Sequence, residues 1–413
     1  MKEVWTPSNE NSVKEAVNQA LANGQTLEIV GSASKRALAR AVEASVVLDM
    51  SAITGVLLYE PEELILIVAP ATPLVEVKEL LAQHDQYLPF DPPDFSALWG
   101  VKEGVGTIGG AVMTGANGSR RLTTGGVRDH VLGVKGINGF GELFVAGGRV
   151  VKNVTGFDLP KLIAGSFGTL CAATQLTLKV LPKPPMAATL LITGLTDVEA
   201  IRAMQCALSD VSVQVSSAAH LPREIVMTSK LKRLAELEKA VSLIRVEGFG
   251  QSVNSGIATL QKLFSANACA IVLDQDESEL VWTEVRNASF FAQSKSTLWH
   301  LSVPPSLGGR VGERLSRELK SRIYYDWAGG AIWLEVDEPS DGGAALIRAV
   351  LKQMAGQDGR ATLMRAPIEV RMKVSPLQPL EPGLAMLNER VRRQFDPQGI
   401  FNPGRMYEMN HAN

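Results

Sequence analysis

The sequence predicts an α+β protein, and three observations support this class. Short apolar runs alternate with amphipathic helical patterns in the first third of the chain, which is typical of α+β or α/β domains. The apolar fraction of 46% and the charged fraction of 20% are those of a soluble globular protein. The 413 residues exceed one typical domain of ~150 residues, so two or three domains are expected.

Hydrophobic periodicity predicts the elements of the first third in chain order. A helix is expected over residues 12–22, and Ser12 with Glu15 forms a capping box at its start. A second helix is expected over residues 73–84, with Thr72 as its cap and a proline in its first turn. Strands are expected over residues 27–30, 46–48, 53–59 and 64–69.

A proline-rich linker divides the chain near residue 183. Pro182, Pro184 and Pro185 make a stiff segment that is typical of a domain boundary. A turn-rich segment over 396–405 closes the chain and contains apolar side chains that need burial. We therefore expect domains over 1–183 and 184–380 and a C-terminal segment over 381–413. Beyond the linker we expect a strand over 188–193 and helices over 198–208, 231–238, 253–263 and 387–395.

Composition excludes several classes of protein. The net charge of −2 argues against a dedicated nucleic-acid binder. Cys171, Cys206 and Cys269 are far apart, so they predict neither an iron–sulfur cluster nor a metal site, and they suit a reducing compartment. The longest aliphatic run, 64–69, is much shorter than the ~20 residues of a membrane span. We expect a cytoplasmic protein that reaches the inner face of a membrane only through a partner.

Glycine is concentrated in one stretch, because 18 of the 37 glycines lie between Gly100 and Gly168. Glycine lets the main chain approach a ligand closely. A G-x-G-x-x-G match over 104–109 lacks a preceding strand and is followed by further glycines, which argues against a Rossmann turn. Gly109 and Gly110 are expected to aim N–H groups at a pyrophosphate from a loop rather than a helix end. Residues 31–35 follow a predicted strand and form a second candidate cradle, with a solvated turn as the alternative.

The order of four motifs makes the chain recognisable. The segments over 107–110, 125–133, 152–162 and 165–170 resemble the FAD-binding fold of the vanillyl-alcohol oxidase and p-cresol methylhydroxylase superfamily. Within it, the chain is similar to the FAD-binding E subunits of bacterial glycolate oxidase (glycolate dehydrogenase). Further matching segments begin at Leu298, Tyr325, Ala361 and Phe395, so the resemblance covers nearly the whole chain. It implies a two-part FAD domain, an α+β cap domain and a C-terminal tail that returns to the FAD domain.

The resemblance also implies a set of cofactor contacts. The flavin is expected to be non-covalent FAD, because none of the five histidines lies where a covalent link is usual, although His130 is near a flavin motif. Residues 117–121 are expected to line the path of the flavin. Ala33, Cys171 and a longer 96–106 segment depart from the usual pattern. The expected FAD contacts are Gly31, Ser32, Ala33, Ser34, Lys35, Thr107, Ile108, Gly109, Gly110, Asn117, Gly126, Val127, Arg128, Asp129, Val131, Asn153, Thr155, Gly156, Ser166, Gly168, Leu170, Asn402 and Arg405.

The implied function is that of an FAD-binding subunit in a complex that oxidises glycolate to glyoxylate. Its expected partners are an FAD-containing catalytic D subunit and an iron–sulfur F subunit, with electrons passing on to quinone. The histidine-rich metal motif of related 2-hydroxy-acid dehydrogenases is absent, so no catalytic residue is assigned. Arg365 is expected to form a structural ion pair rather than bind a carboxylate. A stand-alone FAD-dependent 2-hydroxy-acid dehydrogenase and a structural subunit with a vestigial flavin site remain the alternatives.

Overall fold

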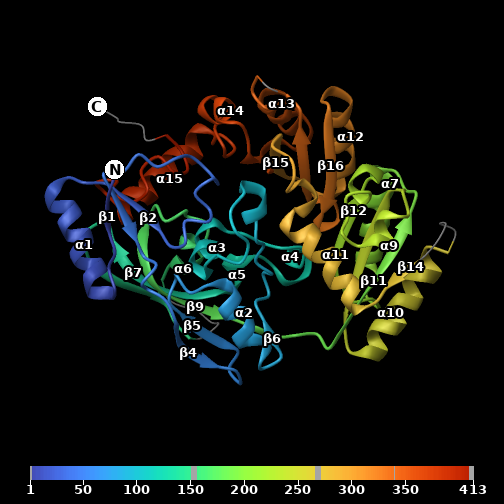
Figure 1. Ribbon diagram of the computed structural model, residues 1–413, viewed down its shortest axis with the longest axis horizontal. Coiled ribbons are helices and arrows are strands. Elements are labelled where there is room, and N and C mark those ends of the chain that lie inside the picture. The colour runs from blue at the N-terminus through green and yellow to red at the C-terminus, as the bar shows by residue number, and fades with distance from the viewer. Residues whose placement is uncertain (1, 150–155, 266–270, 339, 409–413) are drawn as a thin grey trace.

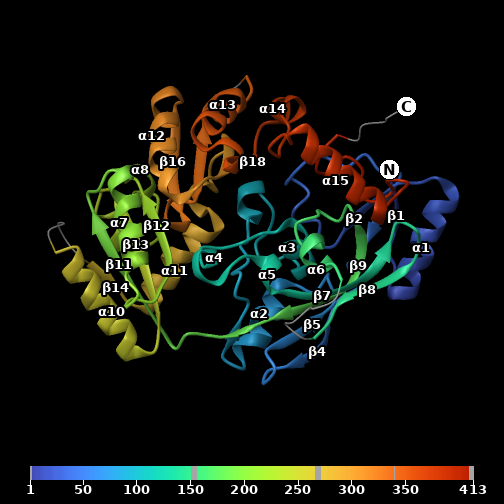
Figure 2. The same cartoon turned by 180° about the vertical axis from the view of Figure 1, so that it is seen from behind.

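The chain folds into two halves that lie side by side, each built around its own β-structure (Figure 1). The computed structural model describes residues 2–149, 156–265, 271–338 and 340–408. Sheets of three, five and two strands belong to the first half, and one sheet of eight strands forms the second. The view from behind shows the C-terminal segment lying over the first half (Figure 2). This arrangement confirms the predicted α+β class.

The first sheet is small and parallel, with strand order β1-β3-β2. Helix α1 (Glu10–Asn23) buries one apolar face against it, as periodicity predicts. The predicted capping box is wrong, because the helix begins before Ser12. Asn9 is the N-cap, and it exchanges hydrogen bonds with Ser12, the third helical residue. The strands are β1 (Glu3–Trp5), β2 (Leu27–Val30) and β3 (Val46–Asp49).

The second sheet is antiparallel, with strand order β4-β5-β9-β7-β8, and α2 and α3 pack on it in one apolar core. The predicted cap of the helix that follows β5 is wrong. The Thr72 hydroxyl donates to the Ala69 carbonyl and accepts the Gly55 N–H, so it closes a turn instead. The elements are β4 (Val56–Glu60), β5 (Ile65–Val68), α2 (Leu74–Ala82), η1 (Ser96–Trp99), α3 (Ile108–Thr114), α4 (Arg121–Thr124), α5 (Val127–His130), β7 (Val131–Asn138), β8 (Leu143–Gly147), α6 (Leu159–Ile163) and β9 (Cys171–Lys179); β6 (Gln86–Tyr87) pairs with β10 (Leu181–Pro182).

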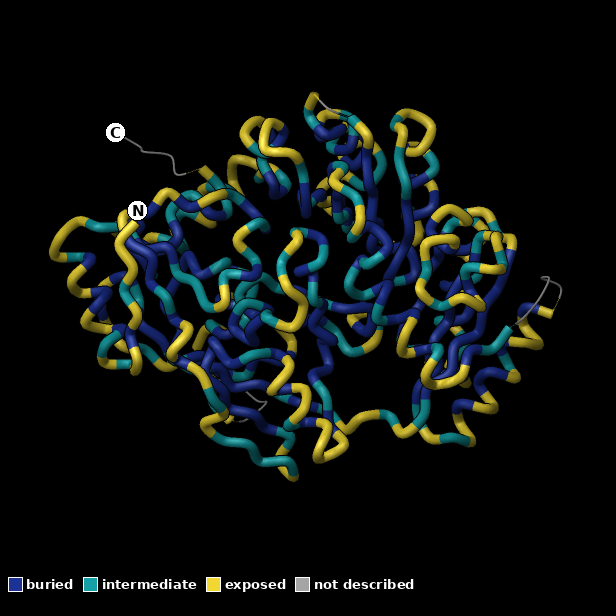
Figure 3. The backbone as a smooth tube through the Cα atoms, viewed as in Figure 1, coloured by how far each residue is buried: buried dark blue, intermediate teal, exposed yellow. Residues whose placement is uncertain are grey.

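The eight-stranded sheet is antiparallel throughout and is buried on both faces, as the dark tube of its strands shows (Figure 3). Its strand order is β14-β11-β13-β12-β16-β17-β15-β18. Side chains alternate between two cores: Tyr324 packs with α11, whereas Tyr325 packs with α7 and α12. The strands are β11 (Met186–Thr193), β12 (Val215–Leu221), β13 (Val241–Gly248), β14 (Ile271–Leu273), β15 (Thr297–Ser302), β16 (Ser321–Asp326), β17 (Ala331–Val336) and β18 (Arg360–Arg365).

None of the described helices that follow residue 184 exceeds 14 residues. The helix predicted over 231–238 is only the single turn α9 (Lys232–Ala235). The longest helices, α1, α10 and α15, each contain 14 residues. Within the described ranges, no helix combines the length and apolar character needed to cross a bilayer. The helices are α7 (Asp197–Ser209), α8 (Arg223–Val226), α10 (Gly250–Leu263), α11 (Gln275–Asn287), α12 (Gly308–Glu318), α13 (Ala344–Ala355), α14 (Ile368–Lys373) and α15 (Pro382–Phe395).

The C-terminal segment extends the small parallel sheet at its β2 edge. Leu27 donates its N–H to the Ile400 carbonyl, and Asn402 donates its N–H back to the Leu27 carbonyl. The Asp396 carboxylate accepts the N–H groups of Ile400 and Phe401 and so fixes the turn after α15. Phe401 is 2% exposed. The tail therefore returns to the first half, as expected, while the domain boundaries at 183 and 380 stay predictions.

Buried ion pairs join the two halves. The Arg120 guanidinium donates two hydrogen bonds to Glu247 on β13, at 3.0 and 2.7 Å. Asp91 binds Arg286 of α11 at 2.8 Å and Arg120 at 3.5 Å. These arginines hold the pKa of Asp91 down to about 2. The indole of Trp99, in the 96–106 segment, donates to the Met364 carbonyl at 2.7 Å, so this segment also packs on the second half.

We predict that Phe401→Ala lowers the free energy of unfolding by about 3–5 kcal/mol, because it empties a fully buried aromatic site where the tail meets the sheet. Urea denaturation measures the effect. Phe249→Ala is the matched control, since Phe249 is 75% exposed, and its cost should stay within about 0.5 kcal/mol. Equal costs for the two variants would refute the packing role of the tail.

Candidate functional site

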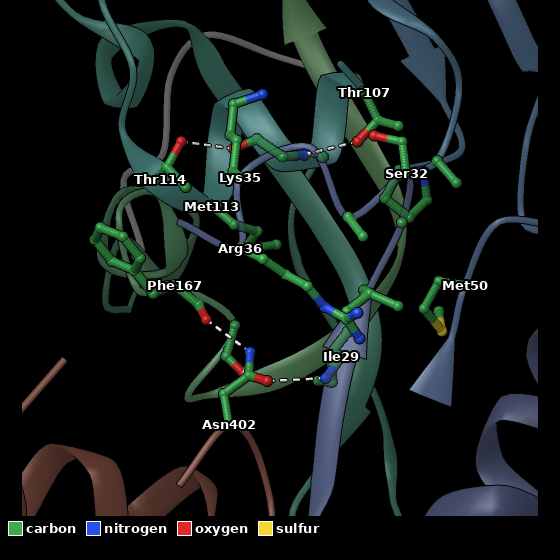
Figure 4. A pocket seen from close by; sticks show the side chains of 18 of the residues that line it. Ile29, Ser32, Lys35, Arg36, Met50, Thr107, Met113, Thr114, Phe167 and Asn402 are labelled. Carbon is green, nitrogen blue, oxygen red and sulfur yellow. Dashed lines mark hydrogen bonds between the residues drawn. The ribbon is translucent and has the colours of Figure 1, made fainter. Parts of the chain in front are cut away.

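A cavity that is partly open to solvent lies between β2, α3 and the returning tail (Figure 4). Eleven of the expected cofactor contacts line it. They are Gly31, Ser32, Ala33, Ser34, Lys35, Thr107, Gly109, Gly110, Gly168, Asn402 and Arg405.

The loop after β2 presents a row of free backbone donors to this cavity. None of the N–H groups over 31–35 donates a hydrogen bond to any described residue. Ala33 takes the left-handed conformation, with φ of 57°, and the loop turns sharply there. Successive free N–H groups in such a turn form a nest that binds anions such as phosphate.

Lys35 adds a positive charge to the same wall. A Cβ built on Gly106 or Gly110 would lie 3.3 or 3.5 Å from its Nζ, so the ammonium lies over these glycines beside α3. Burial lowers the pKa of Lys35, and Asp94 opposes that shift. The described structure gives this ammonium no hydrogen-bonded or ion-paired protein partner, which leaves it available to an anion.

The expected N–H donation by Gly109 and Gly110 is wrong. The Gly109 N–H donates to the Pro70 carbonyl at 2.7 Å, and the Gly110 N–H donates to the Thr107 hydroxyl, which caps α3. These residues therefore begin a helix rather than a free loop. Their small size matters instead, because a Cβ on Gly109 would lie 2.6 Å from the Pro70 oxygen. The described residues 88–107, which precede α3, contain no strand, as the sequence predicts.

The tail supplies two residues that hold the cavity wall together. Figure 4 shows Asn402 between Phe167 and Ile29: its amide donates to the Phe167 carbonyl, and its Oδ1 accepts the Ile29 N–H, both at 2.8 Å. Arg405 donates to the carbonyls of Lys35, Arg36 and Arg40. Burial lowers the pKa of Arg405 to about 10. Arg405 therefore shapes the loop after β2 through its carbonyl oxygens.

The other expected contacts lie elsewhere. Ile108 is buried in the core beneath α3. Asn117 lines a second cavity and accepts the Val127 N–H. Asn153 and Thr155 fall outside the described residues. Neither cavity is lined by Gly126, Val127, Arg128, Asp129, Val131, Gly156, Ser166 or Leu170.

Several lining residues were missed because they carry no motif. Ile29, Met50 and Met113 form the apolar part of the first cavity. Isolated apolar side chains look like core residues in a sequence, and only the fold shows which of them face a cavity. Cys171 also lines this wall, and burial raises the pKa of its thiol to about 12. It is therefore an uncharged, compact lining group.

A second cavity opens next to the first, between α3 and the eight-stranded sheet. The two cavities share Thr114 and Phe167. Polar groups from both halves meet in the second cavity. They are Asn117, Arg121, Arg286, His300, Asp326 and Thr362.

His300 and Asp326 are electrostatically unusual in this second cavity. Burial, with the nearby Arg121 charge, lowers the pKa of His300 to about 4, so the imidazole is neutral at ordinary pH. Burial raises the pKa of Asp326 to about 7, although the Ser119 hydroxyl and the Trp327 N–H both donate to its carboxylate. Among the described residues, no group of histidine, cysteine or acidic side chains could hold a metal ion.

Arg365 has the structural role expected of it. Its guanidinium binds Glu335 at 2.9 Å and the Phe291 carbonyl at 2.7 Å, and it lies in neither cavity. Because its N–H donors are occupied by these acceptors, the Arg365 guanidinium is not available to a substrate carboxylate.

Known proteins resemble this chain in sequence and fold. Residues 1–147 match a sequence family described as FAD binding domain. The chain is 29% identical over 396 residues to glycolate oxidase subunit GlcE of Escherichia coli (strain K12), covering 95% of this chain and 96% of that protein. It is 25% identical over 348 residues to glycolate oxidase subunit GlcD of Bacillus subtilis (strain 168), covering 77% and 70%. A crystal structure of p-cresol methylhydroxylase with substrate bound shares the fold, with a TM-score of 0.73 at 12% identity, covering 99% of this chain and 90% of that one.

The first cavity fits FAD, the cofactor named in the description of the matching sequence family. Its free N–H groups and Lys35 ammonium suit two phosphates, and its apolar wall suits the rings of a dinucleotide. FAD is therefore the cofactor of this chain.

We predict that Gly109→Ala weakens FAD binding by about tenfold or more. The added Cβ would collide with the Pro70 carbonyl and displace α3 from the cavity wall, at an overpacking cost of ~1–3 kcal/mol. Quenching of FAD fluorescence measures the dissociation constant. Gly383→Ala is the control, since a Cβ there meets open space. Unchanged affinity in Gly109→Ala would contradict the assigned wall.

We also predict that Asp326 makes stability fall as the pH rises from about 4 to about 7. The folded chain keeps a proton on Asp326 that the unfolded chain releases near its ordinary pKa of 3.8. Stability from this proton is complete below the unfolded pKa and is lost by the folded pKa, at about 1.4 kcal/mol per pH unit. Asp326→Asn cannot ionise, so the wild-type advantage in urea denaturation should shrink across this window. A difference that is independent of pH would contradict the buried proton.

Proposed function

We propose that this chain is the FAD-carrying subunit of a glycolate dehydrogenase complex, an FAD-dependent oxidoreductase with the fold of p-cresol methylhydroxylase. The complex would oxidise glycolate to glyoxylate. The similarity to GlcE over 95% of the chain supports the subunit type. The observation that carries the proposal is the row of free N–H groups beside Lys35. These groups can still bind an anion, which is the property that a vestigial flavin site would be expected to have lost.

The protein's contribution is to bind and orient the cofactor. We propose that residues 31–35 hold the pyrophosphate through backbone donors, while Asn402 and Arg405 keep that loop in place. Bound FAD supplies the acceptor for two electrons. Asn153 and Thr155, which lie outside the described residues, remain proposed contacts, whereas Ile108 is a core residue.

Electron transfer beyond the flavin requires other proteins. The three cysteines of the sequence have no cluster spacing, so we assign iron–sulfur chemistry to an F subunit and a second FAD to a D subunit. The similarity to both GlcE and GlcD favours an assembly of related flavin subunits. Passage of electrons to quinone, and attachment to the inner face of a membrane through a partner, complete the proposal.

Visible absorption of the purified chain tests its cofactor. We predict flavin bands at about one FAD per chain, and we expect Lys35→Met to weaken FAD binding by about tenfold or more through loss of a charge-assisted contact. Lys102→Met, at an exposed residue, is the matched control and should keep full flavin content. No flavin bands in the wild type, even after FAD is added, would refute the proposal and favour the structural alternative.

Co-expression with the D and F subunits tests the assembly. A stable complex whose flavin is reduced by glycolate and reoxidised by a quinone analogue is the expected result. A flavin-loaded chain that binds neither subunit and turns over a 2-hydroxy acid alone would replace the complex with the stand-alone dehydrogenase. The second cavity is the specific observation that keeps this second candidate open.

A further inference from the structure

The second cavity contains an arginine that forms no ion pair with any described residue, although the charge of Asp129 acts on it from beyond ion-pair distance. No described carboxylate pairs with the Arg121 guanidinium, and no described oxygen accepts its hydrogen bonds. It stacks on the Trp327 indole, with Cζ 4.7 Å from the ring centre. By contrast, Arg120 and Arg286 each form an ion pair with Asp91. Arg121 is thus a cation held at the cavity wall by an aromatic face, with its N–H groups free.

An imidazole without a hydrogen-bond partner contacts the same indole. The His300 ring lies 5.4 Å from the Trp327 ring and 4.7 Å from the Trp333 ring, and no described residue bonds either nitrogen. Successive side chains of a strand point to opposite faces of the sheet, and this explains the direction of the His300 side chain. Trp299 and Leu301 pack into the core with α12 and α13, so His300 between them points to the opposite face, toward the first half.

The charges around these two groups favour an anionic ligand. The Asp326 carboxyl is occupied by the Ser119 hydroxyl and the Trp327 N–H, and its raised pKa reduces its competition for Arg121. Neutral His300 offers a lone pair that can accept a hydroxyl hydrogen. Trp327 and Trp333 enclose the space between them with apolar surface.

We propose that this chain itself binds a small 2-hydroxy carboxylate in the second cavity, with Arg121 holding the carboxylate and His300 accepting the hydroxyl hydrogen bond. A guanidinium matches a carboxylate with two parallel hydrogen bonds. The shared Thr114 and Phe167 place this site next to the proposed FAD cavity. The substrate class rests on the proposed function. The new element is the location of the site, in this subunit rather than only in a partner.

Ligand-observed NMR on the full FAD-loaded chain tests the site, with the flavin kept reduced so that no substrate is consumed. The probes are glycolate and propionate, which have similar size but differ in the hydroxyl group. We expect Arg121→Gln to weaken both ligands by about tenfold or more. We expect His300→Leu to weaken glycolate by about threefold to tenfold and to leave propionate unchanged, because only the hydroxyl contact is lost.

Matched controls separate these roles from general effects. Arg310→Gln and His84→Leu alter exposed residues outside both cavities and should bind both probes as the wild type does. Equal weakening of glycolate and propionate in His300→Leu would show a merely structural histidine and overturn its assignment. Unchanged affinity in Arg121→Gln would overturn the carboxylate site.

Flavin content distinguishes failure of this inference from failure of the proposed function. A wild-type chain with a full complement of FAD that binds neither probe would refute the substrate site and leave the FAD-carrying role intact. A chain that takes up no FAD would refute the proposed function first.

Discussion

The side chain of Asn402 is the contact on which the cofactor cavity depends. It accepts the Ile29 N–H from β2 and donates to the Phe167 carbonyl, so it joins three segments that are far apart in the chain. Gly168 lies so close that a Cβ there would be 2.8 Å from the Asn402 amide. Such short, buried polar contacts are costly to leave unmade. The tail therefore closes the cavity wall as part of the folded first half.

Contacts between residues far apart in the chain also hold the two halves together. Asp91 and Arg120 come from the first half, while Glu247 and Arg286 come from the second; the first three are buried and Arg286 is nearly so. Removing one member would leave an uncompensated buried charge. This network joins the first half to β13 and α11 of the second half, and so it helps to set the shape of the second cavity, which Arg286 lines. The two cavities are neighbours because this contact between the halves is specific.

Particular residues show how far the sequence could predict the site. The loop over 31–35 was found because a strand end with small residues and a lysine is a local feature, and it does line the cavity. Gly109 and Gly110 line the cavity, but the prediction that their N–H groups donate to a pyrophosphate is wrong. Their acceptors, the Pro70 carbonyl and the Thr107 hydroxyl, depend on how β5 and α3 pack. Arg365 was considered for a carboxylate, whereas Arg121 is the arginine that the fold leaves unpaired.

The sequence by itself determined the class of fold and a minority of the strands and helices, because these depend on periodicity and on residues close together in the chain, while the FAD motifs were indicated by the family resemblance. Only the tertiary structure decided that Asn402 closes the cavity and that Arg121 meets His300 on one indole. Those contacts join separate strands and loops whose distances no local pattern encodes. Whether an arginine or histidine is neutralised or free depends on every neighbour that packing brings to it, and this is a property of the folded chain alone.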